Sequence, residues 1–346
     1  MGIIRTLLAL AVVDFHAVGY TGTGHIFGLP FPVGSIAVRS FYVISGFYMA
    51  LILSRRYARD VGWFYQARAL RLYPAYLLVL AATVALMLAQ RDPRLDHWRA
   101  LIDDRDWPTF AWAAFTNLFM VGLDWNFFAG PALTKFNLIP QAWTLGLELT
   151  FYAVAPLLVR CRTVTLALII VASLAARAAA YSLGYDDPDT WRSRFFPFEI
   201  VWFLAGMLAY RGYERLAKLP PPVVRRTGLI ALAACIAAIF AFSSTRYAIQ
   251  LVVLALVPFV FAATKDSKID NLIGEFSYPI YLCHYFILQF IVPANAPYRD
   301  EQIALWSIVC AALLLVAVRP IERWRHQPRK PRGERPAAEE EAGHLA

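Results

Sequence analysis

Charged residues are scarce in this chain: Asp, Glu, Lys and Arg make up 16% of its 346 residues, whereas 59% are hydrophobic. The mean hydropathy is +0.51. So apolar a composition excludes an ordinary soluble domain and indicates a membrane protein with several spanning helices.

Cysteine is also scarce, with four residues and no C-x-x-C pair. The sequence therefore predicts neither a disulfide framework nor a zinc site, and we expect no bound metal. Three motifs of other enzyme classes are missing as well: the G-x-S-x-G elbow, the phosphate-binding P-loop and H-E-x-x-H.

Long apolar stretches are abundant. Ten of them lie near residues 3–19, 35–53, 72–90, 142–159, 164–181, 195–210, 228–243, 247–264, 276–292 and 302–319. An eleventh, 110–123, is short and contains Asn117. Because a spanning helix needs about 20 mostly apolar residues, we expect an all-α fold: a polytopic bundle of about ten transmembrane helices, with a short non-spanning helix near 110–123. The first stretch carries Asp14 and His16 and lacks a clear cleavage site, so we interpret it as a retained helix.

The basic residues predict the orientation. With the N-terminus in the cytoplasm and 110–123 not crossing, 22 of the 33 Lys and Arg residues fall in cytoplasmic segments and nine in outer ones. If 110–123 crossed, every later loop would change sides and the asymmetry would be lost. We expect both termini in the cytoplasm and residues 91–141 in one long outer segment. Because the basic residues are dispersed among loops, no nucleic-acid partner is expected.

The expected domain organisation is a transmembrane domain over residues 1–327 and a tail over 328–346. The tail is rich in Pro, Arg, Glu and Ala, a composition typical of disorder.

Two ionisable residues lie in the first apolar stretch. Arg5 and His16 are eleven residues apart, which on a helix gives about 20° of net rotation and about 16 Å of rise. Both therefore share one helix face at two depths. An ionisable residue inside a membrane is costly and indicates function. His16 suits a general base, whereas Arg5 alone is better explained as a positive-inside anchor.

A second basic cluster follows the second apolar stretch. Arg68 and Arg71 are three residues apart and face the same way on a helix. Paired guanidinium groups suit phosphates, although by themselves these arginines are better explained as positive-inside topology signals.

Further buried charges lie in other apolar stretches. Together with His16, on the predicted topology, they fall in the outer half of the membrane: Arg39, Glu148, Arg177 and Glu199. They could line one polar cavity, or form ion pairs between helices, such as Arg39 with Glu148. Asp14 is about 160° around the helix from His16, so Glu148 is the better candidate to orient that imidazole. His284 is expected in or near the cytoplasmic half of its helix, with its role open.

Six motifs in order give the chain a resemblance to a known family. They are Arg5-x10-His16, Phe41–Phe47 (FYVISGF), Arg68–Pro74 (RALRLYP), Trp143–Tyr152 (WTLGLELTFY), Ser277–His284 (SYPIYLCH) and Arg319–Glu322 (RPIE). In these the chain resembles the acyltransferase 3 family of integral membrane acyltransferases, whose best-known members O-acetylate bacterial surface carbohydrates. Asp14 and Arg39 depart from the residues usual at their positions.

The resemblance implies a fold with ten spanning helices in a bacterial inner membrane. It implies a catalytic His16 and a donor, acetyl-CoA or another acyl-CoA, bound by Arg5, Arg68 and Arg71. The acceptor would be a surface polysaccharide or lipid-linked sugar. Membrane lipid surrounds such a protein, and the oligomeric state stays open, a homo-oligomer included.

The resulting hypothesis is transmembrane acyl transfer, with His16 as general base or acyl carrier. The alternatives are a transporter or flippase for a polysaccharide or lipid-linked precursor, and a non-catalytic assembly or sensory protein. A transporter is expected to show broken helices or an internal repeat, and the sequence shows neither.

Overall fold

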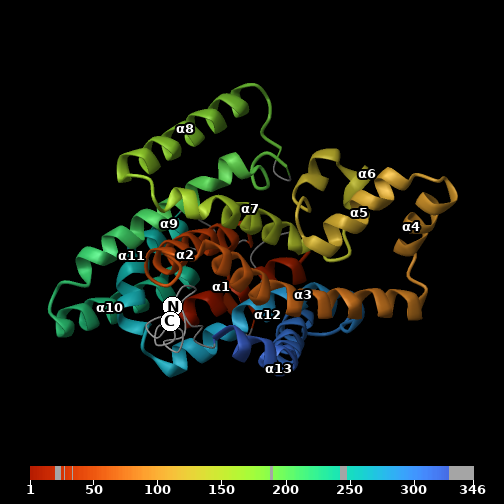
Figure 1. The fold of residues 1–346 in the computed structure, drawn as a ribbon. Coiled ribbons are helices and arrows are strands. Elements are labelled where there is room, and N and C mark those ends of the chain that lie inside the picture. Colours follow the sequence, from red (N-terminus) through yellow and green to blue (C-terminus); the bar gives the residue numbers. More distant parts are fainter. Residues whose placement is uncertain (20–24, 27, 33, 188–189, 242–247, 327–346) are drawn as a thin grey trace, which may run out of the picture.

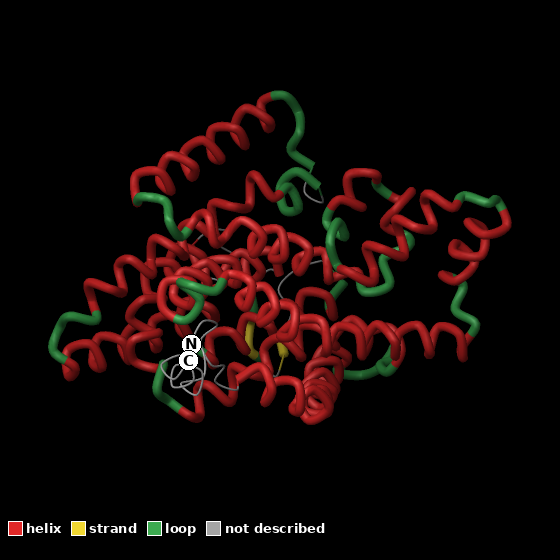
Figure 2. The backbone as a smooth tube through the Cα atoms, in the orientation of Figure 1, coloured by secondary structure: helices red, strands yellow, loops and turns green. Residues whose placement is uncertain are grey.

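The computed structural model describes residues 1–19, 25–26, 28–32, 34–187, 190–241 and 248–326. Nearly all of this chain is helical (Figures 1 and 2). The α-helices are α1 (Gly2–Ala17), α2 (Gly34–Arg55), α3 (Val61–Gln90), α4 (Arg94–Asp103), α5 (Trp107–Phe119), α6 (Pro131–Thr134), α7 (Trp143–Leu158), α8 (Thr163–Ser182), α9 (Phe196–Leu216), α10 (Pro221–Ala241), α11 (Ala248–Thr264), α12 (Lys268–Phe290) and α13 (Arg299–His326). Two 3-10 helices, η1 (Trp125–Ala129) and η2 (Pro140–Ala142), and one small hairpin, β1 (His25–Ile26) with β2 (Leu29–Pro30), complete it. The predicted tail, 328–346, lies outside the described residues.

The predicted helical membrane bundle is confirmed. Each of the ten apolar stretches coincides with a helix, and among the described helices five are long and apolar enough to cross a membrane: α2, α3, α8, α10 and α13. Helices α1 and α7 are shorter, with 16 residues each. They line the interior of the bundle, where neighbouring protein surrounds them (Figure 1).

The segment between α3 and α7 leaves and re-enters the bundle on the same side. The start of α3 lies beside the end of α7, where the Tyr65 hydroxyl donates to the Ala153 carbonyl at 2.9 Å. The two helices are therefore antiparallel, and a crossing by α5 would make them parallel. Helix α5 packs with α4 and α6 at the far end of α3 (Figure 1). It ends at Phe119, four residues before the predicted 123, and the next residue, Met120, terminates the helix with a positive φ of 59°.

Helix α1 runs parallel to α12. Along the pair, Thr6 donates to the Ile273 carbonyl at 2.8 Å, Arg5 donates to the Ser277 hydroxyl at 2.7 Å, and the rings of His16 and His284 lie 5.0 Å apart. Gly274 permits this approach, because a Cβ there would lie 2.7 Å from the Cα of Gly2. Small residues at such crossings let membrane helices pack backbone to backbone.

Helix α2 is antiparallel to α1 and parallel to α9. A Cβ added at Gly46 would lie 1.9 Å from the carbonyl oxygen of Phe203, and one at Gly206 would lie 2.0 Å from that of Val43. The glycine of the FYVISGF motif is therefore required by helix packing. Helix α2 lines both of the cavities described below, so this contact also fixes its position relative to them.

We predict that Gly46→Ala destabilises the protein by about 1–3 kcal/mol, because the new methyl group forces α2 and α9 apart. Gly212→Ala, on α9, is the matched control. Nothing lies within 4 Å of its Cβ, so alanine there is expected to be neutral or slightly stabilising. Thermal unfolding of the detergent-solubilised variants measures both. Equal melting temperatures for the two variants would contradict the packing argument.

Candidate functional site

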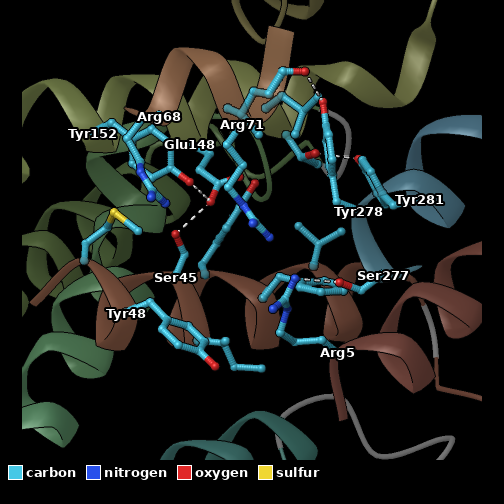
Figure 3. Close-up of a pocket in the computed structure, with 18 of the residues that line it drawn as sticks. Arg5, Ser45, Tyr48, Arg68, Arg71, Glu148, Tyr152, Ser277, Tyr278 and Tyr281 are labelled. Atoms are coloured by element: carbon cyan, nitrogen blue, oxygen red, sulfur yellow. Dashed lines mark hydrogen bonds between the residues drawn. The ribbon is translucent and has the colours of Figure 1, made fainter. Parts of the chain in front are cut away.

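One cavity of about 270 Å³ opens among α1, α2, α3, α7 and α12 (Figure 3). We call it the arginine cavity, because three guanidinium groups line it, those of Arg5, Arg68 and Arg71. The three residues predicted to bind a donor are thus brought together. Its remaining polar lining comes from Tyr42, Ser45, Tyr48, Thr144, Glu148, Tyr152, Ser277, Tyr278 and Tyr281.

The arginine cavity carries more positive than negative charge. Glu148 is its one acidic lining residue, and its carboxylate accepts hydrogen bonds from Ser45, at 2.8 Å, and from Tyr152. Within the described ranges, no ion pair joins Glu148 to any of the three arginines. Such a wall is suited to phosphate or another anion.

A second cavity, of about 430 Å³, lies at the opposite end of α1, α2, α7 and α12. We call it the histidine cavity. Its polar and aromatic lining includes His16, Arg39, Phe127, Gln141, Trp143, Arg194, Glu199, Tyr281 and Tyr285. Arg194 stacks on two of these rings: its guanidinium carbon lies 3.7 Å from the centre of Phe127 and 4.5 Å from that of Trp143. These contacts are cation–π interactions. They hold the planar guanidinium group of Arg194 against two aromatic rings in the cavity wall.

The tautomer of His16 follows from its backbone contact. Its Nδ1 lies 2.8 Å from the Val12 carbonyl oxygen. A carbonyl only accepts, so Nδ1 carries the hydrogen of the neutral ring and Nε2 holds the basic lone pair. The ring packs beside those of His284 and Tyr285, with 5.0 Å and 5.4 Å between centroids. An imidazole held this way can take a proton or act as a nucleophile.

The buried charges of α2, α8 and α9 form ion pairs. Glu199 accepts from Arg39 at 3.2 Å and from Arg177 at 2.8 Å. The expected ion-pair alternative is therefore right in kind, but the partner of Arg39 is Glu199 and not Glu148. The reason is that α2 packs along α9, so Arg39 faces the first turn of that helix.

Glu148 does not lie with His16, as its suggested orienting role requires. Helix α7 begins at the histidine cavity with Trp143, and Glu148 follows five residues later, about 7.5 Å farther along the axis. That step places it in the arginine cavity. The carbonyl of Val12 occupies the Nδ1 position that an orienting carboxylate would take.

The expected depth of His284 is wrong. Because α12 is parallel to α1, His284 lies level with His16 at the histidine cavity. On the predicted topology this level is the outer half of the membrane, whereas the cytoplasmic half was expected. Its side chain is fully buried, and its Nδ1 contacts the Tyr281 carbonyl. Its Nε2 has no hydrogen-bond partner in the described part of the chain.

Three side chains line both cavities and separate them: Val38, Thr144 and Tyr281. We call them the partition. The Tyr281 hydroxyl donates to the Gln141 carbonyl at 2.6 Å and forms a second hydrogen bond with Thr144. Sequence reasoning did not single out these residues, although Thr144 and Tyr281 lie inside two of the quoted motifs.

Comparisons with known proteins identify the family of this chain. The model of a family described as an acyltransferase domain, of the acyltransferase 3 type, matches residues 1–319. The chain belongs to this acyltransferase family. It is 28% identical over 310 residues to the exopolysaccharide production protein ExoZ of Rhizobium meliloti (strain 1021), covering 81% of this chain and 83% of that protein. It is also 31% identical over 159 residues to protein 2 in the picA locus of Rhizobium radiobacter, covering 44% and 76%. No solved structure matches it.

In this acyltransferase, Asp124 connects the segment between α3 and α7 to the site. Its side chain is 1% exposed and lies against α7, where a Cβ at Gly146 would be 2.8 Å from its Oδ1. Burial raises the pKa of Asp124 to about 7, and the backbone amides of Asp124 and Trp125 offset only part of the effect.

This raised pKa predicts a loss of stability as pH rises. Between about pH 4 and 7 the folded state binds more protons than the unfolded state, so the free energy of unfolding falls over that range. From pH 5 to 8 we expect the Asp124 contribution to fall by about 3 kcal/mol. Asp124→Asn should remove this dependence in melting curves measured at several pH values.

Asp92→Asn is the matched control for that experiment. The hydrogen bond from Arg94 lowers the pKa of Asp92, so this carboxylate stays ionised from pH 5 to 8 and its variant should keep the wild-type slope. An unchanged slope in Asp124→Asn would overturn the assignment.

Proposed function

We propose that this acyltransferase moves an acyl group, most simply acetyl, from acyl-CoA to a hydroxyl of a carbohydrate on the other side of the membrane. The observation that carries the proposal is the back-to-back placement of the two cavities. Helices α1, α2, α7 and α12 each run from the arginine cavity to the histidine cavity. A donor and an acceptor can therefore approach the same point from opposite sides.

The arginine cavity is the proposed donor site. Its three guanidinium groups suit the phosphates of CoA, and Arg68 and Arg71 lie near the start of α3, at the membrane face that the positive-inside count assigns to the cytoplasm. With a volume of about 270 Å³, the cavity is smaller than most small-molecule sites. It suits the narrow pantetheine arm, with the nucleotide remaining outside.

The histidine cavity is the proposed acceptor site. Nε2 of His16 removes the proton of an acceptor hydroxyl as the hydroxyl oxygen attacks the thioester carbonyl. The carbon–sulfur bond then breaks, the ester forms, and CoA leaves as a thiolate that takes up a proton. In the covalent variant, Nε2 itself attacks the thioester and passes the acyl group to the hydroxyl. Label retained on the protein without acceptor distinguishes this variant from base catalysis.

The relatives suggest the class of acceptor. The name of the Rhizobium meliloti relative refers to exopolysaccharide production, which favours a surface polysaccharide or its lipid-linked precursor. The proposed location is the bacterial inner membrane, with both termini in the cytoplasm, and the apolar outer faces of α8 and α13 contacting lipid. Glu148 is proposed to balance the charge of the donor site.

We predict that His16→Ala lowers acyl transfer by about 10²–10⁴-fold, with CoA binding unchanged, since His16 lies outside the arginine cavity. Arg68→Ala should weaken CoA binding and raise the KM for the donor. Arg160→Ala, at an exposed loop position, is the control for general loss of positive charge. The assay supplies purified protein with radiolabelled acetyl-CoA and candidate glycans.

Two outcomes would count against the proposal. Wild-type transfer by His16→Ala would refute its catalytic role. Glycan movement across the membrane without thioester turnover would favour the flippase alternative.

The orientation predicts the activity of reporter fusions. Alkaline phosphatase, which is active only outside the cytoplasm, should be active when fused after residue 130 and inactive when fused after residue 218. Activity in the opposite pattern would invert the assignment of the donor and acceptor sides.

A further inference from the structure

The partition raises a question that the proposed function leaves open, which is the length of the acyl chain. If the donor phosphates bind Arg68 and Arg71 while the base is His16, the acyl end must pass from one cavity into the other. Val38, Thr144 and Tyr281 line both cavities. The acyl group therefore meets these three side chains on its way to His16.

Hydrogen bonds hold one side of the partition rigid. The Tyr281 and Thr144 hydroxyls both lie within hydrogen-bonding distance of the Gln141 carbonyl, at 2.6 and 3.3 Å, and they also form a hydrogen bond with each other. Gln141 is fixed in turn, since its side-chain amide donates to the Leu282 carbonyl at 2.9 Å. Both polar members are thus tied to the same turn at the start of α7, and neither is positioned to move aside for a longer chain.

The other side of the partition is apolar and set by one side chain. Val38 is on α2, whose position is fixed by the contact of Gly46 with the backbone of α9. Because α2 is held in place there, the space opposite Tyr281 depends on the volume of residue 38 itself. A methylene group more or less in such a contact is worth about 10–200-fold in discrimination between substrates.

The geometry points to the partition as the acyl-selecting element of this enzyme: Val38 and the Tyr281–Thr144 pair admit a short acyl group such as acetyl and exclude longer ones. This inference rests on the proposed function, and it adds a specificity determinant that lies in neither the donor arginines nor the base. Val38 is its size-setting residue, and Tyr281 is a positioning residue.

The test is a competition between acetyl-CoA and butyryl-CoA with the full-length protein and a glycan acceptor. Wild type should prefer acetyl by at least about tenfold. Val38→Ala should lower this preference about tenfold or more, chiefly through faster butyryl transfer. Val38→Phe should abolish transfer of both groups, while Arg68 and Arg71 still bind the phosphates of CoA.

Tyr281→Phe provides a second variant that nearly conserves volume. It removes both hydrogen bonds of the Tyr281 hydroxyl, so the ring is no longer tied to Gln141 and the acetyl preference should fall. Val171→Ala, an exposed position on α8, makes the same valine-to-alanine change away from the site and should retain the wild-type preference.

The outcomes separate this inference from the function on which it rests. If wild type transfers acetyl but Val38→Ala and Tyr281→Phe keep its preference, the partition is not the selecting element and the proposed function stands. If wild type transfers no acyl group from any CoA thioester, the proposed function fails and the inference fails with it.

Discussion

The close packing of α1 against α12 is the constraint on which the rest of the site depends. The two helices are parallel and approach to backbone contact at Gly2 and Gly274. That contact aligns Arg5 with Ser277 at one level and His16 with His284 at another. A wider crossing would separate both pairs and open the interior of the bundle to lipid, where an ionisable side chain is costly.

A consequence of this packing is that the charged groups of the two cavities are engaged differently. The arginine cavity holds three guanidinium groups around a single carboxylate, whereas in the histidine cavity Arg39 is ion-paired with Glu199 and Arg194 stacks on Phe127 and Trp143. The arginine cavity is suited to bind an anion, and the histidine cavity holds the His16 imidazole among aromatic side chains. The partition keeps the two environments apart, so each can have its own electrostatic character within a few turns of helix.

The sequence predicted the features that depend on composition and on one helix at a time. The ten helices follow from apolar length, the non-crossing segment follows from the loop arginines, and the grouping of Arg5 with Arg68 and Arg71 was expected from the family resemblance. Features that depend on which helices are neighbours were not predictable. The pairing of Arg39 with Glu199 requires the parallel contact of α2 and α9, and the place of His284 requires the direction of α12. Glu148 was misplaced relative to His16 because a few residues along a helix decide which cavity a side chain enters.

The proposed function requires an acyl donor in the arginine cavity with its reactive end at the partition. A structure determined with CoA bound shows whether the donor lies there. We expect the CoA phosphates at Arg68 and Arg71, the pantetheine arm along α1, and the thiol against Val38 and Tyr281 on the side facing His16. CoA bound within the histidine cavity, or with its thiol directed away from the partition, would refute the proposal.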